Sequence, residues 1–458
     1  MNIGIIGMGS MGYNLAKNLV SKDFKVYGFD KNKEIIKKIT FDNIKNLKIE
    51  SSIKELCNNL PSPKIIMLSL PADKIDICIN ELIQYLNPKD IIADLGNSLY
   101  LKSIDRHEYL KSYDICFLGV GVSGGPGGAL SGPAIMVGGS KKAWKETKHI
   151  FNSIAASNGH NIACNYFGSP GSGHFVKLVH NGIEYALMGT LAETTNILKK
   201  AFGKSQNDQS NELNKLLNTN SSSYLLELTS KVLNAQNKDN QFFIDQIDSK
   251  IDQNGTGIWT VNAALELNVS IPAIYSALST RSISSKFNFN GNQETNISNK
   301  KEFVDFNEIN LEEIIFFNFA CSLYQGLDLI NTSNKWDDFS FNIGDVFKVW
   351  NSGCILQGKY LEYIASEYAI NKEFNLNFLY KIISNKTSDN LSSIRKFISI
   401  ASKNSIPSPV LSANLNYFDL VFSKHNIGET IQLQRSFFGQ HPLREKKGNK
   451  IIKPYWTK

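Results

Sequence analysis

The sequence predicts an α/β N-terminal domain with a doubly wound, mostly parallel sheet, then an all-α domain and an extended tail. In the first part of the chain, short apolar segments alternate with segments compatible with helices, a pattern typical of βαβ units. From about residue 171 the strand signals fade and long helix-compatible segments replace them. The expected boundaries are 1–170 for the α/β domain, 171–430 for the helical domain and 431–458 for the tail.

The strands expected in the first domain are short apolar runs. They cover residues 3–7, 25–29, 65–70, 91–95, 115–120 and 134–137. Helix-compatible stretches, including 53–60 and 73–86, lie between several of them. This alternation predicts a sheet whose strands are mostly parallel.

The second domain is expected to consist of helices. They are predicted over 171–200, 211–235, 240–251, 256–268, 312–331, 343–367, 374–385 and 388–403. The polar stretch 288–301 is expected to form a surface loop. Residues 431–458 contain Pro442, Gly448 and Pro454 and are expected to be extended.

The composition is that of a globular protein, with 42% hydrophobic and 20% charged residues. The net charge of +7 is a mild surplus that suits an enzyme acting on anions, and no basic stripe suggests nucleic-acid binding. The six cysteines lie far apart without a CxxC pair, which favours reduced thiols over a metal site. Neither a signal-type N-terminus nor an apolar run of about 18 residues is evident. We therefore expect a cytoplasmic protein that binds no metal, nucleic acid or membrane.

A glycine motif follows the first expected strand. Gly7-Met8-Gly9-Ser10-Met11-Gly12 is a GxGxxG that opens a helix within a unit of βαβ size. Such glycines permit a tight turn, close approach of a pyrophosphate and close helix–strand packing, while the helix N-terminus offers free N–H donors. The motif therefore predicts a Rossmann-type domain that binds NAD or NADP through Gly7, Met8, Gly9, Met11 and Gly12.

Asp30, at the end of the second strand, bears on the choice of dinucleotide. A carboxylate at this position accepts hydrogen bonds from the ribose hydroxyls of NAD and repels a 2′-phosphate. The adjacent Lys31 would weaken that repulsion. The sequence therefore favours NAD without excluding NADP.

A polar stripe is expected at the start of the second domain. In a helix, Lys177, His180, Asn181 and Glu184 fall at i, i+3, i+4 and i+7 and share one face. A solvated surface face would produce the same spacing. Alternatively, the lysine and the carboxylate two turns away form an acid/base pair on either side of a small substrate.

The segment 173–185 resembles the signature of the 6-phosphogluconate dehydrogenase family. Further matching stretches, in the order and at the spacing of the family, are Gly96-Asn97-Ser98, Gly121-Val122-Ser123-Gly124-Gly125, Gly255-Thr256-Gly257-Ile258-Trp259-Thr260, Arg281 and Gln434-Arg435-Ser436-Phe437-Phe438-Gly439-Gln440-His441. The resemblance therefore covers nearly the whole chain.

This resemblance implies a role for each matching residue. Lys177 would be the base that removes the proton of the C3 hydroxyl, and Glu184 the acid that returns a proton to C1 of the enol. The groups implied for the substrate carboxylate and hydroxyls are Asn97, Ser123, His180 and Asn181, and those for a phosphate are Tyr185, Thr260, Arg281 and Arg435. Gly124 and Gly125 are also implied to bind substrate. Asn97 and the loop Leu70-Pro71-Ala72 would face the cofactor. Arg435 and His441 would come from the tail of a partner subunit, which implies a homodimer.

Taken singly, some of these residues have simpler interpretations. Asn97 fits a turn after a strand, Ser123 fits a helix cap, and Arg281 or Arg435 fits a surface ion pair. In register over the whole chain, the family interpretation is favoured.

The chain departs from the family at several positions. Ile258 replaces a lysine that holds phosphate in the family, and Pro126 and Leu130 replace an acidic residue and an arginine. The usual Gly is replaced by Leu95. The usual Lys-Ala-Gly is replaced by Leu70-Pro71-Ala72, and the usual Asn-Arg-Thr by Asp30-Lys31-Asn32. The leading hypothesis is oxidative decarboxylation of 6-phosphogluconate, a phosphorylated sugar acid, to ribulose 5-phosphate. The same chemistry on another 3-hydroxy acid, or a cofactor-binding pseudoenzyme, remains an alternative.

Overall fold

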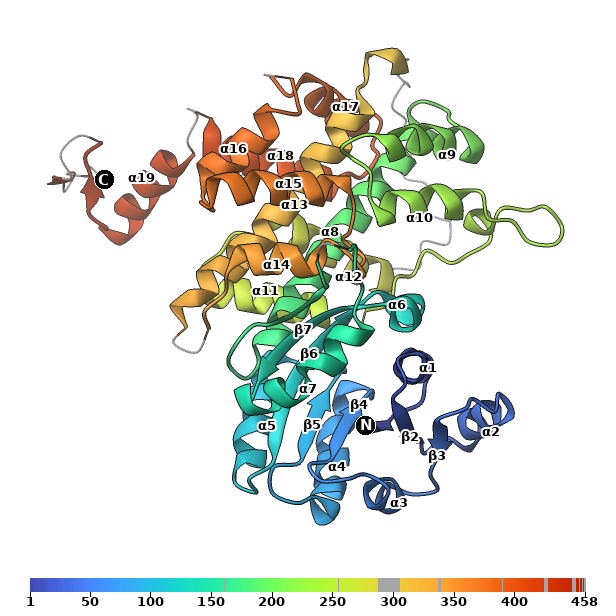
Figure 1. The fold of residues 1–458 in the computed structure, drawn as a ribbon. Coiled ribbons are helices and arrows are strands. Elements are labelled where there is room, and N and C mark those ends of the chain that lie inside the picture. The colour runs from blue at the N-terminus through green and yellow to red at the C-terminus, as the bar shows by residue number, and fades with distance from the viewer. Residues whose placement is uncertain are drawn as a thin grey trace.

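The structure, a computed structural model, describes residues 1–159, 161–253, 255–286, 305–336, 339–388, 390–423, 427–446, 450–452, 454 and 456. Figure 1 shows a sheet covered by helices at the N-terminal end of the chain, a helical body next to it, and a C-terminal segment that stands apart. The polar loop expected at 288–301 lies outside the described residues.

The N-terminal part is built on one eight-stranded sheet with the order β3-β2-β1-β4-β5-β6-β7-β8. Its strands are β1 (Asn2–Ile6), β2 (Lys25–Phe29), β3 (Leu47–Ile49), β4 (Ile65–Leu68), β5 (Ile91–Asp94), β6 (Cys116–Ser123), β7 (Ala134–Gly139) and β8 (Cys164–Tyr166). Its helices are α1 (Ser10–Ser21), α2 (Lys33–Phe41), α3 (Ile53–Asn58), α4 (Ala72–Leu82), the 3₁₀ turn η1 (Ile83–Tyr85), α5 (Tyr100–Lys111), α6 (Gly125–Ser131) and α7 (Lys141–Ile154). Neighbouring strands are parallel except β6 and β7, which confirms the mostly parallel sheet.

Successive side chains of the strands point to opposite faces of the sheet, and each face has its own hydrophobic core. In β4, Ile65 and Met67 belong to the cluster that includes α1 and α7. Ile66 and Leu68 point the other way, into the cluster that includes α3 and α4. Because successive side chains of a strand point to opposite faces, an uninterrupted apolar strand requires helices on both sides. The doubly wound arrangement is confirmed.

The two strands of this sheet that the sequence did not predict are short and lie at its edges. β3 and β8 have three residues each, and they contain Lys48 and Asn165 respectively. Such short, partly polar segments carry no clear apolar run, so only their pairing with β2 and β7 defines them as strands.

The second part is helical, as predicted. Its helices are α8 (Ser172–Lys200), α9 (Gln206–Lys215), α10 (Tyr224–Leu233), α11 (Thr256–Glu266), α12 (Pro272–Lys286), α13 (Leu311–Thr332), α14 (Ile343–Trp350), α15 (Lys359–Asn371), α16 (Leu376–Ser384), α17 (Ser392–Lys403) and α18 (Pro409–Phe422), with the 3₁₀ turns η2 (Leu216–Asn218), η3 (Phe243–Asp245), η4 (Phe306–Glu308) and η5 (Ser333–Lys335). Helix α8 packs against β6 and β7 and also against α11 and α13. It therefore joins the sheet to the helical body.

Several helix predictions need correction. The helix expected at 240–251 is wrong, because this segment contains only η3. Just before it, the Asn237 side chain accepts hydrogen bonds from the N–H groups of Asp239 and Gln241, and such local bonds compete with a helix. The helix expected at 211–235 is divided into α9 and α10, and Ser223 caps the second.

The helix expected at 343–367 is also interrupted. Residues 351–358 separate α14 from α15, and Gly353 in this turn has a φ of +69°, which a helix does not allow. Helices α12 and α18 were not predicted. Each begins at a proline, a residue that is favourable in the first turn of a helix but that usually reads as a break.

The expectation of an extended tail is wrong for its first part. Helix α19 (Gly428–Gly439) precedes a two-stranded antiparallel ribbon of β9 (Leu443–Arg444) and β10 (Ile451–Ile452). Pro442 lies beyond the helix and does not interrupt it. Figure 1 shows α19 and the C-terminus standing away from the helical body, and Phe437 and Phe438 are exposed on this segment.

Candidate active site

Two adjoining cavities share part of their lining, and the larger of these two, where the sheet meets the helical body, has a volume of about 630 Å³. It lies between the end of β6, the first half of α8 and the helices α11 and α12. The predicted site residues that line it are Met11, Asn97, Ser123, Gly124, Gly125, Lys177, Asn181, Glu184, Tyr185 and Arg281. These residues come from both parts of the chain, and the fold brings them to one cavity.

The polar stripe of α8 is not a solvated face. Lys177 is only 7% exposed, and His180 and Asn181 are buried as well. Helix α8 approaches β6 so closely that a Cβ on Gly121 would lie 2.4 Å from Cβ of Lys177. A glycine at this position of β6 therefore permits the lysine to reach the cavity from a buried helix.

Burial changes the acid–base properties of the two candidate catalytic groups in opposite directions. It lowers the pKa of Lys177, because removal from water disfavours the ammonium form, while Glu184 opposes this shift. It raises the pKa of Glu184, against the opposing effects of Lys177 and Arg281. The neutral amine and the protonated carboxyl group are therefore both more accessible near neutral pH than in water, as a base and an acid require.

His180 does not line the cavity but lies directly behind it. Its Nε2 is 3.1 Å from Oγ of Ser123, and its Nδ1 is 3.5 Å from Nζ of Lys177 and 3.7 Å from Oε2 of Glu184. Burial and the neighbouring Lys177 hold the pKa of His180 well below its usual value, so the ring is neutral. This neutral ring connects Ser123 to the lysine and helps to fix the positions of both.

The end of the cavity formed by α11 and α12 holds an arginine. The Arg281 guanidinium lies 3.7 Å from the centre of the Tyr185 ring, and its Nη1 donates to the carbonyl oxygen of Asp252 at 3.3 Å. Of the residues that line this cavity in the described structure, only Lys177 and Arg281 are basic. An anionic group of a ligand would therefore be attracted to these two positions.

Thr260 is not brought to the cavity. It is fully buried, and its single hydroxyl hydrogen is shared between the carbonyl oxygens of Leu178 and Thr256, each 2.9 Å away, which joins α11 to α8. Thr256, one turn earlier, lines the cavity instead. The structure therefore places the first threonine of the Gly-Thr-Gly segment at the site and the second behind it.

The departures at Ile258, Pro126 and Leu130 lie outside the cavity lining. Ile258 is 43% exposed in the first turn of α11. Pro126 is in the first turn of α6, where its carbonyl oxygen accepts from Asn14 of α1, and Leu130 is exposed. None of these three residues therefore lines the cavity within this chain.

Arg435 and His441 are exposed and lie far along the separate C-terminal segment. Arg435 is in α19, and His441 follows it. The structure of one chain does not bring them to its own cavity.

A smaller cavity of about 270 Å³ adjoins the first at the glycine turn. Its lining includes the predicted Gly9, Met11, Gly12, Leu70, Pro71 and Asn97, and it shares Met11, Asn97 and Val122 with the larger cavity. Helix α1 begins here without a side-chain cap, and a Cβ on Gly9 would meet nothing within 4 Å. Free N–H donors beside open space fit the pyrophosphate of a dinucleotide.

The remaining predicted cofactor residues surround this turn without lining the cavity. A Cβ on Gly12 would lie 1.9 Å from the carbonyl oxygen of Gly7, so helix and turn are in close contact. The Asp30 carboxylate accepts from N–H of Met8 at 2.7 Å and from N–H of Asn32 at 2.8 Å. Lys31 forms an exposed ion pair with Glu81 at 3.3 Å, and Ala72 is the first residue of α4.

Some lining residues were missed from the sequence. In the larger cavity they are Val122, Met188, Asp252, Gln253, Thr256 and Ile355; in the smaller one, Ser10, Leu15, Ser69, Leu95, Gly96 and Val122. Helical spacing could have identified Met188, which follows Glu184 by one turn. No local signal indicates Ile355, which comes from the turn that interrupts the predicted helix 343–367.

Among the described residues, the structure contains no cluster of His, Cys, Asp and Glu suited to a metal ion. The same residues include no helix both long and apolar enough to cross a membrane.

Comparison with known proteins identifies relatives over the full length. Residues 2–168 match the NAD binding domain of 6-phosphogluconate dehydrogenase, and residues 173–456 match the C-terminal domain of 6-phosphogluconate dehydrogenase. The decarboxylating 6-phosphogluconate dehydrogenase of Staphylococcus aureus (strain N315) is 30% identical over 465 residues, covering 99% of this chain and 98% of that protein. The corresponding protein of Buchnera aphidicola subsp. Acyrthosiphon pisum (strain APS) is 31% identical over 450 residues, covering 96% and 95%.

A solved structure is also similar over the whole chain. It is 6-phosphogluconate dehydrogenase from Plasmodium falciparum, studied in its apo form, with its cofactor NADP⁺ and with its substrate 6-phosphogluconate. The TM-score is 0.89 at 32% identity, and the match covers 100% of both chains.

Proposed function

The chain belongs to the 6-phosphogluconate dehydrogenase family, and we propose that it converts 6-phosphogluconate to ribulose 5-phosphate and CO₂ while reducing NAD(P)⁺. The observation that carries the proposal is the presence of Lys177 and Glu184 in one cavity that adjoins the glycine turn. In this proposal, residues 1–170 bind the dinucleotide, 171–430 bind substrate and form the dimer, and 431–458 reach the partner subunit.

Lys177 is the base of the oxidation step. Its buried neutral amine takes the proton of the C3 hydroxyl, and a bound NAD(P)⁺ would supply the acceptor for the C3 hydride. The resulting ammonium group then donates a hydrogen bond to the new C3 carbonyl oxygen. This stabilises the negative charge that develops on that oxygen as the C1 carboxylate leaves as CO₂.

Glu184 is the acid of the last step. Loss of CO₂ leaves an enol, and the carbon that carried the carboxylate, C2 of the substrate and C1 of the product, needs a proton before the product forms. A carboxyl group with a raised pKa keeps that proton available near neutral pH. Asn97, Ser123 and Asn181 are positioned to orient the substrate carboxylate and hydroxyls, and the backbone of Gly124 and Gly125 borders the same space.

Arg281, stacked on Tyr185, is the phosphate ligand supplied by the same chain, with Thr256 beside it. A single guanidinium leaves part of a phosphate dianion without a cationic partner. We infer that Arg435 and His441 of a second subunit complete this end of the cavity, which makes the enzyme a homodimer. The exposed apolar side chains of the C-terminal segment, including Phe437 and Phe438, support its packing against another chain.

For the cofactor, we infer a preference for NAD over NADP. The Asp30 carboxylate lies against the glycine turn, and each of its oxygens retains a lone pair for a ribose hydroxyl. Lys31, which would offset the repulsion of a 2′-phosphate, is paired with Glu81. At an effective dielectric constant near 20, two charges about 4 Å apart interact by roughly 4 kcal/mol, and solvent exposure reduces this to about 1–3 kcal/mol.

Exchange of Asp30→Asn together with Lys31→Arg is therefore expected to shift the ratio of kcat/KM for NADP to that for NAD upward by about tenfold to a hundredfold. The ratio is measured at fixed ionic strength. Asp114→Asn is the matched control, because this exposed aspartate precedes the first residue of β6, whereas Asp30 follows the last residue of β2. A wild-type enzyme that already prefers NADP strongly would contradict the inference.

A substrate screen tests the function itself. We expect 6-phosphogluconate to give the highest kcat/KM among 3-hydroxy acids, with one CO₂ released for each reduced cofactor. The alternative is the same chemistry on another 3-hydroxy acid, which Ile258 suggests because a cation of the family is missing there. A higher kcat/KM for an unphosphorylated acid would favour that alternative. Dinucleotide binding without turnover of any acid would indicate a pseudoenzyme.

A further inference from the structure

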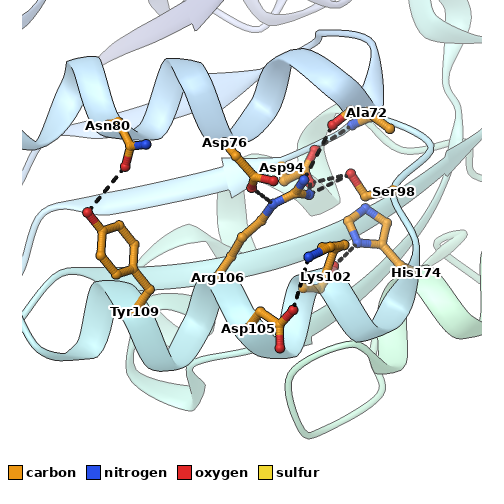
Figure 2. A network of polar contacts seen from close by, with 12 residues as sticks. Ala72, Asp76, Asn80, Asp94, Ser98, Lys102, Asp105, Arg106, Tyr109 and His174 are labelled. Carbon is orange, nitrogen blue, oxygen red and sulfur yellow. Dashed lines mark hydrogen bonds and ion pairs between the residues drawn. The ribbon is translucent and has the colours of Figure 1, made fainter.

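A buried ion pair lies beneath the two loops that adjoin the glycine turn. Asp94, the last residue of β5, is fully buried, and Arg106 of α5 is 5% exposed. Nη1 of Arg106 donates to Oδ2 of Asp94 at 2.8 Å. Figure 2 shows the guanidinium between the end of β5 and the start of α4, facing Asp76, Asp94, Ser98 and Ala72.

The Asp94–Arg106 pair forms hydrogen bonds with the loop after β5 on both sides of Asn97. Oδ1 of Asp94 accepts from N–H of Gly96 at 2.9 Å, and Oδ2 accepts from Oγ of Ser98 at 2.7 Å. Nη1 of Arg106 also donates to Oγ of Ser98 at 2.8 Å. The residues immediately before and after Asn97 are therefore both bound to this pair, and Asn97 is one of three residues shared by the two cavities.

The same guanidinium reaches the loop after β4. Its Nε donates to Asp76 of α4 at 2.5 Å, and its Nη2 lies 3.4 Å from the carbonyl oxygen of Ala72. The two loops are in direct contact, because a Cβ on Gly96 would lie 2.7 Å from the carbonyl oxygen of Leu70. Leu70 and Pro71 line the smaller cavity. One planar group with five fixed donors therefore sets the spacing of two loops that border the dinucleotide cavity.

A second contact joins α5 to the helix that carries Lys177. Oγ of Ser103 lies 2.6 Å from Nδ1 of His174, which is buried in α8 one turn before the lysine. Helix α5 therefore contacts both the Asn97 loop and α8.

We propose that Asp94 and Arg106 are positioning residues that hold Asn97 and the loop Leu70–Ala72 in the geometry needed for hydride transfer. Neither residue lines either cavity, so both act through the loops. The proposal rests on the proposed function, because its main measure is turnover. A displacement of about 1 Å in a group that orients substrate or cofactor reduces turnover by up to about a hundredfold.

The opposite end of the same strand supplies a matched control. Asp90 directly precedes β5, is fully buried, accepts from N–H of Lys64 at 2.7 Å and pairs with its Nζ at 3.0 Å. Asp90 and Asp94 therefore have the same chemistry and burial at the two ends of β5. Only Asp94 is next to the loops of the site.

The experiment compares Asp94→Asn with Asp90→Asn by melting temperature, by kcat and KM for substrate and cofactor, and by the Kd for reduced dinucleotide. We expect both variants to melt at lower temperature. Asp94→Asn should lower kcat/KM by about tenfold to a hundredfold and weaken dinucleotide binding several-fold, whereas Asp90→Asn should stay within about twofold of wild type. Equal kinetic losses at equal loss of melting temperature would overturn the proposal, since a merely structural role predicts them.

Arg106→Lys is the variant to compare with wild type if Asp94→Asn does not fold. A lysine keeps the positive charge beside Asp94, but it lacks the planar guanidinium group whose nitrogens contact Ser98, Asp76 and Ala72 at the same time. We expect a melting temperature close to wild type with kcat/KM lowered by about tenfold, and wild-type kinetic constants would overturn the proposal. If the wild-type enzyme turns over no 3-hydroxy acid, the proposed function fails, and the dinucleotide Kd values of the same variants still decide the positioning role.

Discussion

The Lys177→Met variant is expected to lose turnover by about a thousandfold or more while it binds dinucleotide normally. Methionine has a similar length and suits the buried position, so we expect the fold to be retained, but it removes the group that we propose as the base for the C3 hydroxyl and the donor for the C3 carbonyl. Lys177 lines the larger cavity and is absent from the lining of the smaller one, which explains why cofactor binding should survive. The measurements are the steady-state rate and a fluorescence titration with reduced dinucleotide.

Lys200→Met is the matched control, because it places the same substitution at the exposed end of the same helix. Its rate should equal that of wild type. Glu184→Gln is expected to depress the overall rate severely with binding unchanged, since an amide cannot protonate the enol. A Lys177→Met enzyme with a rate near wild type would show that another group is the base.

The parts of the site that the sequence predicts are those with a local pattern. The glycine turn is recognised because spacing and strand context together define it, and α8 places Lys177 and Glu184 on one face because helical spacing fixes that geometry. Helical spacing does not show whether such a face is exposed to solvent or buried, and the burial of its side chains answers that question. A solvated stripe and a catalytic stripe have the same periodicity, and only the packing of α8 against β6 distinguishes them.

The parts that could not be predicted depend on contacts between distant segments. Ile355 reaches the cavity from a turn more than 150 residues after Lys177 in sequence, and Arg106 meets Asp94 and Asp76 only because three elements converge. Thr256 and Thr260 occupy the same helix and the same quoted motif, yet only the packing of α11 determines which one faces the cavity. In the tail, a local pattern was misleading. Pro442, Gly448 and Pro454 predicted an extended chain, although residues 428–439 precede all three and form a helix.

A mixture of Lys177→Met and Arg435→Ala subunits is expected to show a higher rate than either parent at substrate concentrations well below the wild-type KM. In the proposed homodimer each site combines the body of one subunit with the C-terminal segment of the other. A mixed dimer then contains one site with both defects and one site with neither. Random exchange gives mixed dimers in half of the population, so the rate should reach about a quarter of that of wild type. Arg435→Ala alone should lower kcat/KM by about tenfold to a hundredfold, as expected for loss of a charge-assisted bond to phosphate.

The control is a mixture of Lys177→Met with Glu184→Gln. Both residues lie on α8 of the same body, so no combination of these subunits contains an intact site, and the mixture should stay inactive. Exchange of subunits is followed independently by co-purification of differently tagged chains. Because Arg435 is exposed in α19, which stands apart from the helical body, a contribution of this residue to a site would require a second chain. If Lys177→Met and Arg435→Ala subunits exchange and their mixture remains as slow as the parents, Arg435 does not act across the dimer, and Arg281 with Thr256 must hold the phosphate within one chain.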